Sequence, residues 1–235
     1  MLSNPQVFLV TSLFLVPAAF VAIPVHELAH ALAAYVQGDR SVRYHGLFNP
    51  DPRRFIEPYG LVAVFLARVG WGMPIPVNEQ RLRGAGGQVA YALAGPVGNL
   101  LVAVVFGIVL RILLANHVLF EPASLVQTPL GYVAYIVYAI YFLNLSFFAF
   151  NLLPLPGLDG WRVLEALFRR RNPRFFFNAA MRRRDIWGIA VLAIFITSFL
   201  GIPLLSSVML PFYAPASTVI FGTCLGYPGL QPCPL

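Results

Sequence analysis

The apolar stretch from Val7 to about Val36 is interrupted by three ionisable side chains, His26, Glu27 and His30. As a helix, such a stretch measures about 45 Å, enough to cross a bilayer core of about 30 Å. Residues four apart share one face of a helix, so the two imidazoles can bind one ion, with Glu27 about a quarter turn away. Ionisable groups in hydrocarbon are costly unless they are paired or bind a metal. The pattern therefore predicts a metal site inside a transmembrane helix.

The rest of the chain has the composition of a polytopic membrane protein, with 59% hydrophobic and 11% charged residues among 235. We expect an all-α fold with about four full transmembrane helices. The N-terminal stretch lacks the basic residues of a secretory signal, so the first span is expected to be retained. The four spans are predicted at Val7–Val36, Gly86–Leu114, Leu130–Leu153 and Ile186–Leu210.

Shorter segments are expected to lie at the membrane surface or to enter it only partly. Residues 59–73 are apolar but too short to cross, which favours a re-entrant or interfacial element. In Gly70–Asn78, prolines alternate with apolar residues, which predicts a short extended, β-like segment at the membrane surface. Residues Trp161–Phe168 are predicted to form an amphipathic surface helix. The small-residue patch Ala94–Asn99 allows close helix packing, and Asn99 is expected to hydrogen-bond across that interface.

The distribution of charged residues predicts how the chain is oriented in the membrane. The net charge of +7 comes from arginines alone, clustered in loops beside the spans, which indicates a cytoplasmic membrane face rather than a nucleic-acid surface. We therefore expect a multi-pass protein of the plasma membrane, with the metal motif towards the cytoplasm. The runs Arg169–Arg171 and Arg182–Arg184 are interpreted as anchors to anionic headgroups.

The chain is predicted to consist of one integral membrane domain, residues 1–210, with a core at about 7–168. Residues 211–235 are expected to form a Pro- and Gly-rich tail outside the cell. Its two cysteines, Cys224 and Cys233, could oxidise to one disulfide there. They are the only cysteines in the chain, so a cysteine-based metal site is excluded.

A third metal ligand must come from another segment, because a hydrolytic zinc site takes three protein ligands and an open position for water. Asp159 is the best candidate. It follows a turn that Pro154, Pro156 and Gly157 impose at the inner end of the third span. His45 is the competing candidate, but it lies in the arginine-rich loop after the first span.

Four motifs together resemble the site-2 protease family of intramembrane zinc metalloproteases, peptidase family M50. They are His26–His30, Gly70–Asn78, Ala94–Asn99 and Asn151–Gly160, and they fall within about residues 20–165. The second and third resemble the compact branch without a PDZ domain. The resemblance implies one zinc ion bound by His26, His30 and Asp159, Glu27 as the catalytic acid/base, and a role for Asn151 in holding the substrate or its oxyanion.

The expected activity is hydrolysis of peptide bonds in or near transmembrane segments of other membrane proteins, by a water that zinc activates and Glu27 deprotonates. A membrane protein with a structural or regulatory metal site is the alternative, although such a site needs no general base and is usually closed by a fourth ligand. A transporter with histidine and aspartate relays is a third possibility, but the chain shows no internal repeat. The oligomeric state is not predicted.

Overall fold

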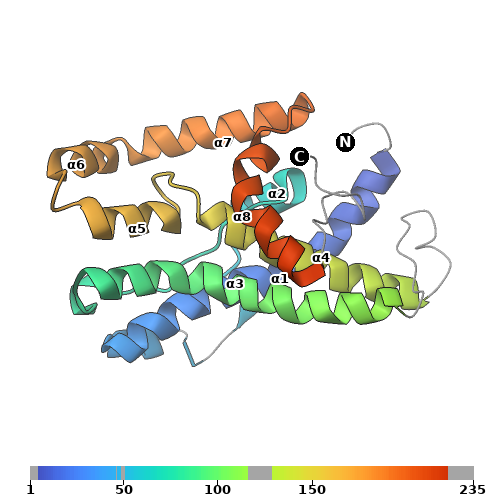
Figure 1. The fold of residues 1–235 in the computed structure, drawn as a ribbon, viewed down its shortest axis with the longest axis horizontal. Helices are drawn as coiled ribbons and strands as arrows, with labels where there is room; N and C mark the ends of the chain where they lie inside the picture. The colour runs from blue at the N-terminus through green and yellow to red at the C-terminus, as the bar shows by residue number, and fades with distance from the viewer. Residues whose placement is uncertain (1–4, 46, 49–50, 116–128, 222–235) are drawn as a thin grey trace.

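The computed structural model describes residues 5–45, 47–48, 51–115 and 129–221. Eight α-helices account for most of them (Figure 1). They are α1 (Pro5–Gln37), α2 (Pro58–Ala67), α3 (Gly84–Ala115), α4 (Pro129–Asn151), α5 (Asp159–Phe168), α6 (Pro173–Met181), α7 (Arg183–Phe199) and α8 (Leu204–Phe221). Three short 3-10 helices join them: η1 (Arg40–Tyr44), η2 (Pro52–Arg54) and η3 (Glu79–Arg81). Within the described ranges there is no sheet, only two isolated bridges.

The all-α membrane fold is confirmed. Four helices are long and apolar enough to cross a bilayer, namely α1, α3, α4 and α8. The first three agree with the predicted spans to within two residues at every boundary, and α5 agrees with the predicted amphipathic helix. The predicted disulfide between Cys224 and Cys233 lies outside the described residues.

The fourth predicted span, Ile186–Leu210, is wrong as a single helix. The chain forms α7, of 17 residues, and then α8, separated by a short break. Two features impose that break: Gly201 adopts a positive φ of 73°, and Pro203 lacks the N–H that a continuing helix needs. In addition, α8 continues to Phe221 with Pro211 inside it, where the tail was expected to begin.

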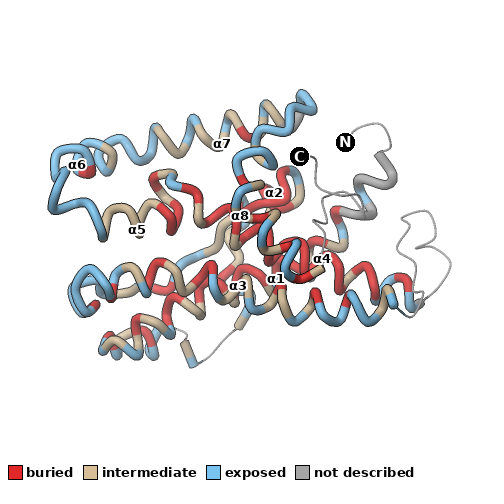
Figure 2. Tube along the Cα trace, in the orientation of Figure 1, coloured by how far each residue is buried: buried red, intermediate tan, exposed pale blue. Residues whose placement is uncertain are grey.

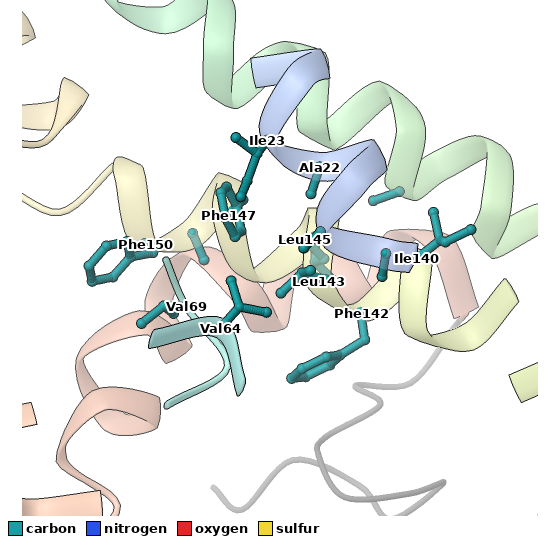
Figure 3. Close-up of a cluster of buried hydrophobic side chains, with 14 of the residues drawn as sticks. Ala22, Ile23, Val64, Val69, Ile140, Phe142, Leu143, Leu145, Phe147 and Phe150 are labelled. Carbon is teal, nitrogen blue, oxygen red and sulfur yellow. The ribbon is translucent and has the colours of Figure 1, made fainter. Parts of the chain in front are cut away.

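The centre of the molecule is α4. From Ala134 to its end, most of its side chains are buried, whereas the outer faces of α3 and α8 are exposed (Figure 2). Helices α1, α3 and α4 pack on one another, and α8 covers part of α4. In the close-up, Ile23 of α1 lies beside Phe147 of α4, and Val64 of α2 approaches the same cluster (Figure 3). The metal motif begins one turn beyond Ile23, so it is held against the most buried helix.

The segment after α2 lies close to the motif, because a Cβ atom at Gly72 would lie 3.5 Å from Oε1 of Glu27. Helix α2 has 10 residues, about 15 Å, too short to cross the membrane. Gly72 forms an isolated antiparallel bridge with Ile56, and the N–H of Met73 donates to the carbonyl of Phe55 at 2.8 Å. Residues 73–78 form no helix and no further bridge, so their β-like character stays a prediction.

A buried carboxylate, Asp39, ties this segment to the end of α1. It accepts hydrogen bonds from the Ser41 hydroxyl at 2.6 Å and from the Asn78 backbone N–H at 2.7 Å, and Arg81 lies 3.3 Å away. Burial alone would raise the pKa of Asp39, but these hydrogen bonds lower it below its ordinary value. The charged carboxylate therefore ties the Asn78 end of the loop that carries Met73–Asn78 to the end of α1.

Candidate metal centre

Two histidines of α1 and the first residue of α5 meet inside the bundle. The Nε2 atoms of His26 and His30 lie 3.1 Å apart, and each lies 3.1 Å from Oδ2 of Asp159. All three side chains are buried. Within the described part of the chain, they are the only group of His, Cys, Asp and Glu that could hold a metal ion. The competing candidate, His45, is exposed at the end of η1 and does not join them.

The three converging atoms suit zinc. In a tetrahedral site with bonds of about 2.0–2.1 Å, neighbouring ligand atoms are about 3.3 Å apart, close to the 3.1 Å found for each pair here. Two imidazoles and one carboxylate are also a donor set of hydrolytic zinc sites. Two nitrogen lone pairs and a carboxylate oxygen repel one another at this distance unless a cation or a proton lies between them.

The other nitrogen of each imidazole points to an acceptor. Nδ1 of His26 lies 2.7 Å from Oδ1 of Asn99, and Nδ1 of His30 lies 2.7 Å from the backbone carbonyl of Tyr91. Because a carbonyl can only accept, each Nδ1 carries the hydrogen and each Nε2 presents a lone pair. This is the arrangement of metal-bound histidines.

Asn99 also makes the predicted hydrogen bonds across the helix interface, to the carbonyl of Ala22 in α1 and to Asn144 in α4. Sequence analysis did not predict its contact with His26. A signal was available: a metal-bound histidine needs a partner at its second nitrogen, and a buried asparagine in the small-residue patch of a neighbouring span can supply one.

Gly95 brings α3 close to the ligands. A Cβ atom there would collide with Nε2 of His30 and lie 2.8 Å from Nε2 of His26. Gly98, one turn later, similarly lies against Ala29. The close packing predicted for Ala94–Asn99 is therefore confirmed, and it creates a space beside both Nε2 atoms that any larger residue would fill.

A positively charged side chain, Arg162, lies next to Asp159. The guanidinium of Arg162 lies 3.8 Å from Oδ1 of Asp159 and 3.4 Å from the Tyr91 hydroxyl. This positive charge favours the ionised form of Asp159, and a carboxylate is the form that binds a metal.

A cavity of about 580 Å³ opens beside the ligands. Glu27 and Asn151 line it, together with Gly72 and Trp187 of α7. The Asn151 amide donates to the carbonyl of Phe147 at 3.0 Å, which leaves its second N–H for another acceptor. Three candidate ligands beside a cavity are the arrangement expected of an open zinc site, because a structural zinc site would be closed by a fourth ligand.

Comparison with known proteins gives concordant results. Residues 14–195 match the family described as Peptidase family M50. The chain is 36% identical over 194 residues to a Bacillus subtilis protein named "Putative zinc metalloprotease YwhC", covering 80% of this chain and 82% of that protein. It is 34% identical over 160 residues to "Putative zinc metalloprotease Rip2" of Mycobacterium tuberculosis, covering 66% of this chain and 57% of that protein. No solved structure matches.

Proposed function

Because the chain belongs to peptidase family M50, the site-2 proteases, and is a zinc metalloprotease with membrane-spanning helices, we propose that it cleaves peptide bonds in or near transmembrane segments of other membrane proteins. His26, His30 and Asp159 hold the zinc in this proposal. The observation that carries it is the triangle of 3.1 Å contacts inside the bundle, open on one side to a cavity that Glu27 lines.

The ligands and Glu27 divide the chemistry between them. Zinc bound at such a site lowers the pKa of a coordinated water to about 7 and polarises the scissile carbonyl. Glu27 follows His26 directly in α1 and lines the same cavity. It accepts the proton of the attacking water and passes it to the leaving amine. Asn151 donates its second amide N–H to the oxygen on which negative charge develops.

A helical substrate hides its peptide bonds in its own hydrogen bonds, so it has to unwind before attack. We infer that the segment Met73–Asn78 pairs with the unwound stretch by strand addition. Its position supports this, because Gly72 and Pro74 line the same cavity as Glu27. Pro74 and Pro76 have no N–H, so on their edge the substrate would donate to their carbonyls.

The site is expected to face the cytoplasm from the plasma membrane. Supporting this orientation, the arginines at 169–171 and 182–184 are exposed where α5 is joined to α6 and α6 to α7. Arg183 and Arg184, the first residues of α7, also line the cavity, so part of the orientation signal lies at the site itself.

The test is purified protein in detergent, analysed for metal and incubated with a synthetic transmembrane peptide. Wild type should contain one zinc per chain and cleave the peptide. Glu27→Gln should keep the zinc and lose cleavage, because glutamine cannot take the proton from water. Cleavage that survives in this variant would exclude Glu27 as the general base, and a wild type without zinc would exclude the metal centre.

A further inference from the structure

A chain of buried amides runs from α4 through α3 to the first metal ligand. Asn144 donates to the carbonyl of Ile140 at 2.8 Å and accepts from Asn99 at 2.9 Å. Asn99 in turn lies 2.7 Å from Nδ1 of His26. Both asparagine side chains are fully buried, so their hydrogen bonds do not compete with water.

Backbone carbonyls set the direction of this chain. The carbonyl of Ile140 can only accept, so the NH₂ group of Asn144 faces it and the oxygen of Asn144 faces Asn99. The NH₂ group of Asn99 therefore faces Asn144, and it also donates to the carbonyl of Ala22 at 2.9 Å. The oxygen of Asn99 is then left facing His26. Turning the Asn99 amide over would set its oxygen against the oxygens of Ala22 and Asn144. Turning the Asn144 amide over would set its oxygen against the carbonyl of Ile140 and its NH₂ group against that of Asn99.

We propose that Asn99, oriented by Asn144, is a positioning residue that fixes the tautomer and the ring orientation of His26 and so sets the affinity of the metal centre. The proposal rests on the metal centre of the proposed function. It goes further by assigning a role to two residues that touch neither metal nor substrate. Asn99 bridges three helices here, since it contacts Ala22 in α1 and Asn144 in α4 from its own place in α3.

The expected effect follows from the chemistry of metal-bound histidine. Loss of the partner at the second ring nitrogen typically lowers metal affinity by about 10- to 100-fold. Asn99→Leu removes that partner at similar volume, so it should weaken zinc binding by about that factor. Asn99→Asp keeps an oxygen for Nδ1 and should bind zinc at least about tenfold more tightly than Asn99→Leu. Asn144→Leu leaves the NH₂ group of Asn99 bonded to Ala22 alone, and the zinc affinity of this variant should fall between those of wild type and Asn99→Leu.

The experiment measures zinc affinity of the full-length protein in detergent by competition with a chromophoric chelator, without any substrate. The cobalt-substituted protein is measured in parallel, because its visible spectrum reports the geometry around the metal. Tyr141→Phe is the matched control. It removes a buried hydrogen bond between α4 and α8, Tyr141 to Ser217 at 3.1 Å, that touches no ligand. Its zinc affinity and cobalt spectrum should equal those of wild type.

Each outcome of the experiment either supports or overturns the proposal. Weaker zinc binding by Asn99→Leu than by both wild type and Asn99→Asp, with an altered cobalt spectrum in Asn99→Leu, supports the proposal. Equal affinity of Asn99→Leu and wild type overturns it. So does equal weakening in Asn99→Leu and Asn99→Asp, because the oxygen at Nδ1 would then not matter. If Asn99→Leu fails to fold, the comparison of Asn144→Leu with Tyr141→Phe decides. A wild type that binds no zinc refutes the metal centre itself.

Discussion

Nε2 of His30 lies 3.1 Å from Oδ2 of Asp159, although 129 residues separate them in the sequence. The contact exists only because α4 returns beside α1 and the turn after Asn151 places the start of α5 at the same level. Metal bound across this contact joins the first helix to the fifth. Zinc binding should therefore stabilise the whole bundle rather than one helix.

Zinc removal should lower the thermal stability of the protein. A ligand that binds only the folded state at 100 times its dissociation constant contributes about 2.7 kcal/mol. Unfolding of the detergent-solubilised protein, followed with and without a chelator, should show a higher midpoint with zinc. Asp159→Asn should abolish the difference, because it removes the ligand that links α5 to α1. The same zinc-dependent increase in Asp159→Asn would show that the stabilising ion binds elsewhere.

Asn151→Ala should lower kcat while leaving zinc content and KM nearly unchanged. An oxyanion donor acts in the transition state, and removing one typically costs about 10²- to 10³-fold in kcat. Steady-state cleavage of a transmembrane peptide together with metal analysis checks this. Asn172→Ala is the control, an exposed asparagine at the start of α6 whose side chain makes no capping hydrogen bond. A raised KM at unchanged kcat would instead assign Asn151 to ground-state binding.

The sequence predicts this fold well where hydrophobic length decides and poorly where local breaks decide. Three spans follow from uninterrupted apolar runs, and α1, α3 and α4 match them. The boundary near Gly201 and Pro203 was missed because the surrounding residues are as apolar as a span. At Pro211 the error was the opposite, because the sequence was interpreted as ending the span there. Neighbouring helices allow a membrane helix to continue through proline, and α8 does so.

The candidate site likewise has parts that the sequence predicts and parts that it does not. That His26 and His30 lie together is predictable because their spacing is local, and that Asp159 joins them because it follows a Pro/Gly turn; their role as metal ligands stays a prediction. The partners that orient the histidines are harder to predict. Asn99 comes from another helix, and the acceptor for His30 is a backbone carbonyl of Tyr91, which has no sequence signature. The contacts that tune the centre therefore depend on how α1 packs against α3.

The loop that carries Met73–Asn78 should loosen at low pH. Because the folded state holds the pKa of Asp39 below its ordinary value of 3.8, the stabilisation from this carboxylate is fully present above about pH 4. It is lost as the pH falls from there through the lower pKa of the folded state. Limited proteolysis between pH 3 and 6 should show faster cleavage of the loop at the acid end.

Asp39→Asn should be cleaved faster already at pH 6 and should depend less on pH. The control is Asp51→Asn, which removes an exposed ion pair with Arg53 and should change little. If Asp39→Asn kept the pH dependence of wild type, another group would be responsible.

Gly95→Ala should weaken zinc binding although it adds only one methyl group. The new Cβ would collide with Nε2 of His30 and lie 2.7 Å from Cε1 of His26, so the imidazoles or α3 must move. Displaced ligands lower metal affinity, and we expect a loss of about tenfold or more, as for other changes next to metal-bound histidines. Chelator competition measures it.

Two further alanine substitutions in α3 separate this effect from helix packing. Gly86→Ala adds a methyl group where no atom lies within 4 Å, and it should leave both stability and zinc affinity unchanged or slightly raise stability. Gly98→Ala brings its Cβ within 2.9 Å of the Ala29 Cβ, so it tests tight packing of α3 on α1 away from the ligand nitrogens. Gly98→Ala could lower zinc affinity as much as Gly95→Ala does, at equal loss of stability. In that case the spacing of the helices, rather than contact with the ligands, would control the zinc affinity. If only Gly95→Ala lowered it, the absence of a side chain at that one position is what leaves room for the metal between the histidines.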